Sequence, residues 1–334
     1  MEMILSFDDK FSSLLLKLKD RISPINISPK YLRHYICDFI ELYTFFYKES
    51  VTRSEILDLF NDCEFNLAKV DRQNITGLSK AEIAEKQEEE VAYLFQCLEY
   101  RKNIISSKYP FLIDVNSIKL HNNLSDEQKI YLSFLFASNI SIFSEFESDL
   151  TSEFEYFVYN AAKSFFPEQA IIKQFGKNSD YVGNAQTKIN SLAIDLKIRT
   201  RDTEIAKVTG NQEKGLDLIA WIPFNDQDTN MLIYLFQCAC GDGWIKKFSE
   251  TKRYLAYYDF YKLMPHSIMA SSYAFNMMGE FEKSDDIISS ESLFFDRLRL
   301  MEYINSDHVL EHENLQSIAL IEKLITTQNI ALNL

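Results

Sequence analysis

The sequence contains no long apolar stretch. None of its runs reaches about 18 uncharged apolar residues, so we expect no membrane-spanning segment and no membrane partner. The first residues lack the basic and then apolar layout of a secretory signal peptide. Cysteine is scarce, and the 5 cysteines are an odd number without framework spacing, which is typical of a reducing compartment. These absences predict a cytoplasmic protein.

Several catalytic motifs are also missing. The chain has no Walker loop, no dinucleotide fingerprint and no Gly-x-Ser-x-Gly, and its 5 histidines show no partner for an acyl-transfer triad. Basic residues are fewer than acidic ones, 35 Lys and Arg against 49 Asp and Glu, which gives a net charge of −14. Such a chain does not wrap nucleic acid over its whole surface, although a local basic cleft or a basic partner can still bring DNA to it.

Glycine is almost absent from the first half of the chain. Of the 8 glycines only Gly77 precedes residue 150, whereas six lie between Gly176 and Gly243. Because glycine serves tight turns and close backbone approach, this distribution predicts helices first and a mixed α/β part second. The length favours two domains. We expect an α+β or α/β protein with an all-α partner-binding or regulatory domain over 1–148, followed by an α/β domain with a mixed sheet and a helical C-terminal tail over 149–334.

Three patterns of the capping-box type predict helix starts in the first part. They are Thr52 with Glu55, Ser79 with Glu82, and Ser125 with Gln128. A long helix is expected over 80–102, and we interpret its polar run 87–90 as a solvated face.

The second part alternates between helix-like and strand-like segments. Helices are expected over 152–166, 184–207, 244–261 and 293–304, and strands over 170–175, 216–224, 231–239 and 265–272. Pro167 ends the first of these helices, and the turn-forming residues 225–230 join the two central strands into a hairpin.

Asp217 and Gln237 are the pair most indicative of a site. Both lie ten residues from the centre of the predicted turn, near residue 227, so a regular antiparallel hairpin places them opposite each other. Directly opposed side chains have Cβ atoms about 5 Å apart. A carboxylate beside Leu216 and Ile219 is costly to bury unpaired, so Asp217 should bind a cation, meet a base or lie at the open end of its strand.

Residues 150 to about 272 resemble the restriction-endonuclease-like, PD-(D/E)xK nuclease superfamily, particularly its Mrr-like branch. In that family the core runs helix, three strands, helix, strand, and the first helix often carries a glutamate, as Glu155 does here. The second strand begins with a metal-binding Asp after a glycine-containing loop, as in Gly215-Leu-Asp217. The third strand ends in Glu-x-Lys, or Gln-x-Lys in the Mrr-like branch, where this chain reads Gln237-Cys-Ala239.

The resemblance implies a Mg²⁺-dependent DNA endonuclease or nuclease effector of a bacterial anti-phage defence or restriction system. Asp217, Glu155 and a backbone oxygen at 237–238, the Cys238 carbonyl included, would hold one or two Mg²⁺ (or Mn²⁺) ions, with Gln237 in the catalytic set. The metal would lower the pKa of the attacking water and stabilise charge on the phosphate. The setting also implies a partner protein, such as an ATPase or sensor subunit, and is compatible with a homo-oligomer.

The chain departs from the family at the lysine that helps to activate water. Ala239 occupies that place, and Lys246 and Lys247 on the following helix are the available substitutes. Lys252 and Arg253 extend this basic stretch and suit phosphate contacts. A second hypothesis follows from Ala239: a catalytically inactive nuclease-fold subunit that serves as a binding scaffold in a multiprotein defence complex.

Each candidate residue also has a structural interpretation. Glu155 could close a capping box with Ser152, Asp217 could be a surface acid at a strand start, and Gln237 could be a buried amide that satisfies the backbone. The basic residues from Lys246 to Arg253 could be the solvated face of a helix. These alternatives stay open at the level of sequence.

Three further motifs favour structure over chemistry. His308-Val-Leu-Glu-His312 has the spacing of an inverted zinc protease, but too few residues follow to supply a third ligand, so a chance match on a helix is the better explanation. Cys238 and Cys240 share a strand face without a second cysteine pair, as buried thiols do. Asp296-Arg-Leu-Arg299 is expected to form an internal ion pair, with DNA phosphate contact as the alternative.

Overall fold

The computed structural model describes residues 5–20, 31–47, 49–63, 65–70, 77–176, 178–210, 215–226, 231–241, 243–248, 250–260, 264–275, 291–310 and 315–327. These residues form two compact units. Unit 1 contains residues up to 150 together with 273–275 and 315–327, and unit 2 contains 151–272 and 291–310. The fold is mixed α/β, as the sequence predicts. Among the described residues, no helix has both the length and the apolar character needed to cross a bilayer.

Unit 1 is mainly helical but contains a small sheet. Its elements are α1 (Phe7–Asp20), α2 (Leu32–Tyr47), β1 (Val51–Thr52), α3 (Arg53–Asp62), η2 (Leu67–Lys69), α4 (Lys80–Ile105), η3 (Ser106–Lys108), β2 (Phe111–Ile113), β3 (Ser117–Leu120), α5 (Asp126–Ser138), η4 (Ser144–Phe146) and α12 (Gln316–Thr326), where η marks 3-10 helices. The strands pair antiparallel in the order β1-β3-β2. The expectation of an all-α domain is therefore wrong, because strands of only two to four residues carry too little periodicity to be recognised.

The predicted helix starts in unit 1 are confirmed. Thr52, Ser79 and Ser125 each accept a hydrogen bond from the backbone N–H three residues on, and the side-chain oxygen at that position accepts one from the backbone N–H of the cap. Each box satisfies two of the backbone groups that a helix leaves unpaired at its first turn. The long helix expected over 80–102 is α4.

One face of α4 differs from the sequence prediction. Glu88 and Glu89 are exposed, but Gln87 and Glu90 are buried, so the polar run is not a uniformly solvated face. Both Glu90 carboxylate oxygens accept from the Arg33 guanidinium, at 2.6 and 2.7 Å. This bidentate pair lets a carboxylate of the polar run take a buried place against α2.

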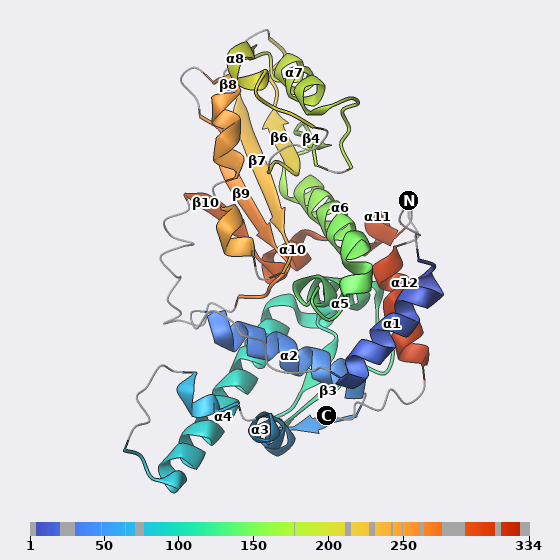
Figure 1. Ribbon diagram of the computed structural model, residues 1–334, viewed down its shortest axis with the longest axis vertical. Coiled ribbons are helices and arrows are strands. Elements are labelled where there is room, and N and C mark those ends of the chain that lie inside the picture. The colour runs from blue at the N-terminus through green and yellow to red at the C-terminus, as the bar shows by residue number, and fades with distance from the viewer. Residues whose placement is uncertain are drawn as a thin grey trace. The chain divides into compact units, whose positions relative to one another are not determined.

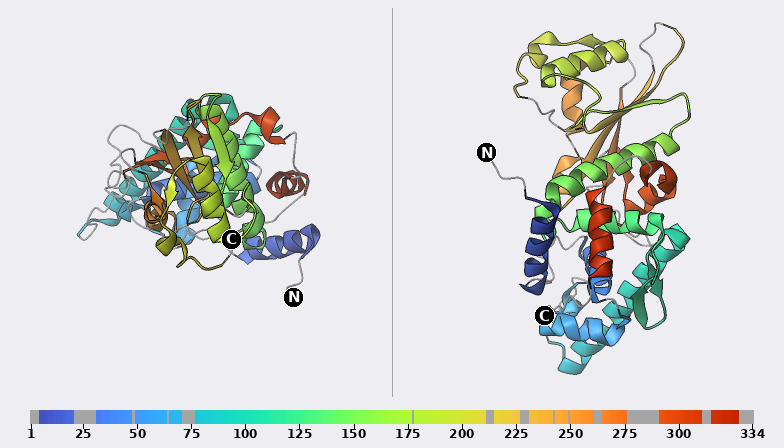
Figure 2. Two further views of the ribbon diagram at one scale, coloured as in Figure 1. Left: turned by 90° about the horizontal axis from the view of Figure 1, so that it is seen from above. Right: turned by 90° about the vertical axis from the view of Figure 1, so that its right-hand side faces the viewer.

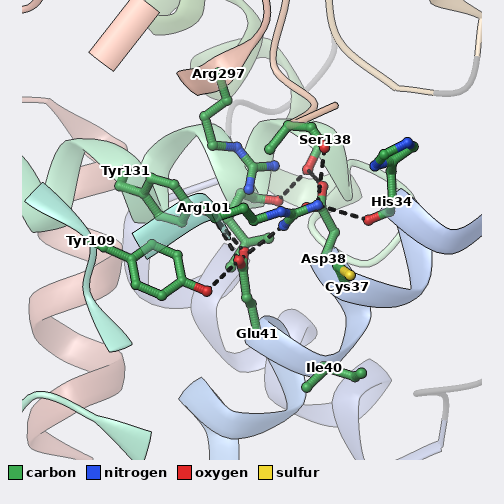
Figure 3. A network of polar contacts seen from close by, with 12 residues as sticks. His34, Cys37, Asp38, Ile40, Glu41, Arg101, Tyr109, Tyr131, Ser138 and Arg297 are labelled. Carbon is green, nitrogen blue, oxygen red and sulfur yellow. Dashed lines mark hydrogen bonds and ion pairs between the residues drawn. The ribbon is translucent and has the colours of Figure 1, made fainter. Parts of the chain in front are cut away.

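A buried cation lies at the centre of unit 1 (Figure 3). Arg101 of α4 is fully buried and donates to Asp38 Oδ1 at 2.6 Å and to Glu41 Oε1 at 2.9 Å, both on α2. The hydroxyls of Tyr109 and Tyr131 donate to Glu41. Further partners are the carbonyls of His34 and Ala274, which accept from Arg101, and Ser138, whose hydroxyl donates to Asp38. The network joins segments far apart in sequence through one guanidinium.

The C-terminal helix α12 belongs to unit 1. It lies beside α1 in the right-hand view of Figure 2. Lys323 of α12 pairs with Asp8 of α1, and its ammonium lies over the Phe11 ring. Lys129 of α5 contacts Glu322 from the other side at 2.8 Å. The unit therefore includes chain from both sides of unit 2 in sequence.

Unit 2 is built on a five-stranded mixed sheet (Figure 1). Its strands are β4 (Ile171–Gln174), β6 (Leu218–Ile222), β7 (Leu232–Ala239), β9 (His266–Ser271) and β10 (Ser292–Phe295), in the order β10-β9-β7-β6-β4. β4, β6 and β7 pair antiparallel, whereas β7, β9 and β10 are parallel. The mixed sheet and its four expected strands are confirmed. The antiparallel pairing places the start of β6 beside the end of β7.

Helices cover both faces of this sheet. On one face α6 (Glu147–Phe165) packs its apolar stripe against the strands, and the ring of Phe166, just after the helix, contacts Tyr234 and Phe236. The other face contacts α7 (Ala185–Asp195) and the 3-10 helix η6 (Thr251–Ala256) through a second apolar cluster that includes Trp221, Leu192 and Tyr254. Burial on both faces explains why the central strands are continuous apolar runs.

Three predicted helices of unit 2 are shorter than expected. α7 stops at Asp195 because Lys197 takes a left-handed conformation, φ 55°, and the following turn closes with Ile198 N–H donating to the Ala193 carbonyl. The chain continues through β5 (Arg199–Thr200), α8 (Asp202–Ile205) and later β8 (Tyr258–Asp259), and β5 pairs with β8.

The segment expected as one helix over 244–261 forms η5 (Trp244–Lys247) and η6, then β8. Trp244 contacts the rings of Phe248 and Phe294, whereas Tyr254 contacts Phe175. A single straight helix presents one apolar stripe, so aromatic side chains buried in two places require a break.

The last expected helix, over 293–304, begins with strand β10. Asp296 then caps α10 (Arg297–Tyr303) by accepting from the Arg299 N–H at 3.0 Å, and α11 (Ser306–Leu310) follows. Buried Arg297 donates Nε–H to the Ser272 carbonyl, and Arg299 donates to the Phe294 carbonyl. Both arginines thus contact backbone oxygens of their own unit.

Removal of the buried guanidinium should unfold unit 1 readily. Arg101→Met leaves Asp38 and Glu41 as buried carboxylates without their cation, and breaking a buried pair in this way costs about 3–5 kcal/mol. We expect denaturant unfolding to report a loss of this size. Lys102→Met, on the neighbouring residue, should change stability by less than about 0.5 kcal/mol. Equal effects of the two substitutions would contradict the assigned role of Arg101.

His34 should make stability depend on pH. Burial, with the charges of Arg101 and Arg33, lowers the pKa of His34 from 6.5 to about 3. Between these values the unfolded chain binds a proton that the folded chain does not, so stability falls as pH decreases from 6.5 towards 3, by up to about 1.4 kcal/mol per pH unit. His34→Phe should remove this dependence. Denaturant midpoints at pH 4.5 and 7.5 that shift equally in both proteins would argue against it.

Candidate active site

The pairing of β6 and β7 brings Asp217 against Gln237. Leu218 pairs with Phe236, and the Asp217 N–H donates to the Phe236 carbonyl, which continues the antiparallel register by one residue. Gln237 Nε2 donates to Asp217 Oδ2 at 2.7 Å, and the Cys238 backbone N–H donates to the same oxygen at 2.6 Å. The predicted juxtaposition is confirmed, and Asp217 is a half-buried, hydrogen-bonded carboxylate rather than a surface acid.

Glu155 reaches the same place from α6. Gly176 lies two residues after the end of β4, next to the Asp217 backbone. A Cβ built on Gly176 would lie 3.1 Å from Asp217 Oδ1 and 3.4 Å from Glu155 Oε2. Both carboxylates therefore crowd one glycine, whose N–H donates to the Asp217 carbonyl. The capping alternative for Glu155 is wrong, because α6 begins at Glu147 and the Ser152 hydroxyl accepts from Asn178.

A third carboxylate, Glu250, was not recognised from the sequence. A Cβ on Gly215 would lie 2.8 Å from Glu250 Oε2 and 3.1 Å from Gln237 Oε1. Glu250 precedes η6 and is the only acid of the basic stretch 246–253, a pattern that the helix interpretation treats as a surface charge. The sequence signal that could have found it is Gly215 two residues before Asp217, which marks a close approach to the backbone.

Gln237 has both a structural and a site-like character. Its Nε2 also donates to the Cys238 carbonyl at 3.0 Å, so the amide does satisfy backbone, as the structural alternative held. Its Oε1 is buried without a hydrogen-bond partner, although the residue is only 3% exposed. Buried polar atoms are nearly always paired, so an acceptor left without a protein donor indicates a place for a water, a cation or a proton.

The two cysteines at the end of β7 are neutral thiols. Burial, then the charges of Asp217 and Glu155, raise the pKa of Cys238 well above its usual value, and burial also raises the pKa of Cys240. The Cys238 carbonyl, expected as a metal ligand, accepts the Gln237 amide hydrogen bond, so what Cys238 contributes to Asp217 is its N–H.

The two candidate lysines differ in their surroundings. Lys247 is half-buried and its charge lowers the pKa of both Cys238 and Cys240, although burial dominates at each thiol, so its ammonium lies near the end of β7. Lys246 is exposed. The structure therefore favours Lys247 over Lys246 as an amine near the carboxylates.

The two residues expected to contact nucleic acid are exposed and have acidic neighbours. Lys252 pairs with Glu291 at 3.2 Å, and Arg253 lies 3.8 Å from Glu250 Oε1. Exposed ion pairs of this kind are weak and screened by salt, so both cations can exchange these carboxylates for phosphate. Of the zinc-like histidine pair, His312 and the His308 side chain lie outside the described residues.

The residues present fit a hard divalent cation. Asp217 and Glu155 offer carboxylate oxygens, and the buried Oε1 of Gln237, on the side of the amide away from Asp217, offers a further oxygen beside Glu250. Within the described ranges no group of three or more His, Cys, Asp and Glu side chains could hold a metal ion by itself. Mg²⁺ is usually held by one or two carboxylates together with substrate phosphate and water, which is the donor set available here.

Comparison with known proteins finds no match: no protein-family model, no curated protein and no solved structure matches the chain.

The acid pair should be sensitive to a single methyl group on Gly176. The backbone of Gly176 is outside the left-handed region, so Gly176→Ala is strained only by the contacts of its Cβ with Asp217 and Glu155. We expect the free energy of unfolding of this variant to stay within about 1–2 kcal/mol of the wild-type value, while its Mn²⁺ binding weakens by about tenfold or more. Gly243→Ala, where a Cβ would meet nothing within 4 Å, is the matched control. Unchanged Mn²⁺ affinity in Gly176→Ala would show that the pair binds no cation.

Proposed function

We propose that unit 2 is a Mg²⁺-dependent nuclease that hydrolyses phosphodiester bonds, a DNA endonuclease or nuclease effector of a bacterial anti-phage defence or restriction system. The observation that carries the proposal is the Asp217 carboxylate, oriented by Gln237 Nε2 and the Cys238 N–H and crowded with Glu155 at Gly176. Half-buried carboxylates beside oriented donors offer oxygen ligands to a divalent cation, and such groups are frequent at functional sites.

The order of elements supports the same proposal. Apart from α7, β5 and α8 inserted between β4 and β6, and the short β8 before β9, helix α6 is followed by the antiparallel strands β4, β6 and β7, then by η5 and η6, and then by β9 parallel to β7. This is the helix, three strands, helix, strand sequence that the resemblance to PD-(D/E)xK nucleases implies. The candidate residues lie at the start of β6 and the end of β7, the places that the resemblance assigns to them.

Each residue has a role in the proposed chemistry. Asp217 and Glu155 would hold Mg²⁺, which when bound lowers the pKa of water and offsets charge on the phosphate. Gln237 fixes the Asp217 carboxylate through Nε2, and Lys247 supplies the amine that Ala239 cannot. Lys252 and Arg253 would contact the phosphate backbone.

The charge distribution is compatible with a nucleic acid substrate. Residues 151–272 contain 14 Lys and Arg and 14 Asp and Glu, so this part is formally neutral although the whole chain carries −14. The remaining chain thus holds the acidic excess, and repulsion of DNA would be weakest around residues 151–272. Unit 1 would then bind or respond to a partner protein, such as an ATPase or sensor subunit.

A second function, a nuclease-fold scaffold without catalysis, is favoured by one observation. Ala239 stands where the resembling family has its lysine, and it is 1% exposed. If Lys247 does not reach the reacting phosphate, the unit would bind DNA or a partner without cutting.

Cleavage of plasmid and linear DNA with Mg²⁺ or Mn²⁺ tests the proposal. The wild type should cut, Asp217→Ala should lose cutting, and Lys247→Ala should be slower by about 100-fold or more, the usual contribution of a proton-transferring side chain. Lys246→Ala is the matched control and should cut at the wild-type rate.

Absence of cutting has to be separated from a missing partner. The assay is therefore repeated with proteins that co-purify from the native host. Continued absence of cleavage with these partners and both metals present, combined with intact DNA binding, would replace the nuclease by the scaffold.

A further inference from the structure

An acceptor without a donor lies beside the acid pair. Gln237 Oε1 is buried and makes no hydrogen bond, while Nε2 of the same amide donates to Asp217 Oδ2 and to the Cys238 carbonyl. These two donated bonds fix the orientation of the amide, because exchanging Oε1 and Nε2 would place oxygen against oxygen at both partners. Oε1 therefore points away from Asp217 by necessity.

Glu250 and Gln237 Oε1 both lie close to Gly215. The place of a Cβ on Gly215 lies 3.1 Å from Gln237 Oε1, 2.8 Å from Glu250 Oε2 and 2.5 Å from Glu250 Cβ. Gly215 also has φ +92°, so both its backbone and its contacts exclude a side chain. The glycine that precedes Asp217 thus serves to admit Glu250 beside Gln237.

Oε1, the other oxygen of Glu250, has only a long ion-pair contact with Arg253. Arg253 lies 3.8 Å from Glu250 Oε1 with half of its side chain exposed, a weak and screened pair. Oε2, on the Gly215 side, faces the Gln237 acceptor. Both acceptor oxygens lie near the same point, the place of a Cβ on Gly215, and two such oxygens repel each other unless a cation or a donor such as water lies between them.

We infer that Glu250 Oε2 and Gln237 Oε1 form a second divalent-cation position of the Mg²⁺ class, next to the Glu155–Asp217 pair. The oxygen-only donors suit Mg²⁺, Mn²⁺ or Ca²⁺, and Glu250 is partly exposed, so an ion and its waters can enter from that side. Gln237 then links the two positions, because its Nε2 orients Asp217 while its Oε1 receives the second ion.

The role of this ion rests on the proposed function. In a phosphodiesterase, a second cation stabilises the oxygen opposite the one that the first cation serves. The alternative occupant of the same space is a proton on Glu250 that is donated to Gln237 Oε1. The two occupants respond in opposite ways to replacement of Glu250 by glutamine.

The test is a Mn²⁺ titration of the full chain, followed by the electron paramagnetic resonance signal of free Mn²⁺ and paired with thermal unfolding at pH 7.5. The wild type should bind two Mn²⁺ ions, and Glu250→Gln should lose one, with at least about tenfold weaker binding at that position. Glu155→Gln should weaken the other. Glu168→Gln, at an exposed residue of unit 2, is the matched control and should bind as the wild type does.

Two results would overturn the inference. The first is Glu250→Gln binding Mn²⁺ with wild-type stoichiometry and affinity. The second is a melting temperature of Glu250→Gln without metal that equals or exceeds the wild-type value, together with an unchanged shift of that temperature on adding Mn²⁺. The new amide N–H would then have replaced a proton on Glu250.

The readout also separates this inference from the proposed nuclease. If Glu250→Gln loses one Mn²⁺ and the wild type cuts no DNA with its partners present, the cation position is supported and the nuclease proposal is contradicted. If DNA cleavage depends on Asp217 and Glu250→Gln binds Mn²⁺ as the wild type does, the nuclease proposal is supported and the second cation position is contradicted.

Discussion

The register of β6 against β7 is the constraint on which the candidate site depends. With Leu218 opposite Phe236, the next pair along the strands is Asp217 and Gln237, and the amide donates to the carboxylate at 2.7 Å. A slip of one residue would turn Asp217 to the other face of the sheet and Gln237 away from it. Apolar burial on both faces of β6 and β7 fixes this register, so the core energetics of unit 2 also position its polar residues.

Two glycines allow the remaining carboxylates to approach that pair. Gly176 gives room to Asp217 and Glu155, and Gly215 gives room to Glu250 beside Gln237. The result is a row of three acids with one amide between the second and the third. Like charges so close together raise the free energy of the unliganded state, which is why such an arrangement is better explained by a cation than by stability.

Unit 1 also buries carboxylates, and there a buried arginine of the same unit neutralises them. Arg101 is fully buried and receives the two carboxylates of Asp38 and Glu41, with the hydroxyls of Tyr109 and Tyr131 on the Glu41 oxygens. A buried ion pair of this kind contributes little net stability over apolar packing, but it admits few alternative arrangements. In unit 1 the protein supplies a buried cation at 2.6–2.9 Å, whereas the only cation paired with Glu250 among the described residues is the exposed Arg253 at 3.8 Å.

The sequence by itself determined what depends on neighbours along the chain. The three capping boxes, the strands of the central hairpin and the meeting of Asp217 with Gln237 follow from local spacing, because a turn and an alternating pattern set a register within some twenty residues. Only the tertiary structure decided the small sheet of unit 1, whose β1 and β3 are far apart in sequence, and the approach of Glu155 and Glu250 to the hairpin. Those depend on how α6 and the 3-10 turns pack on the sheet, and packing between distant segments leaves no fixed spacing in the sequence.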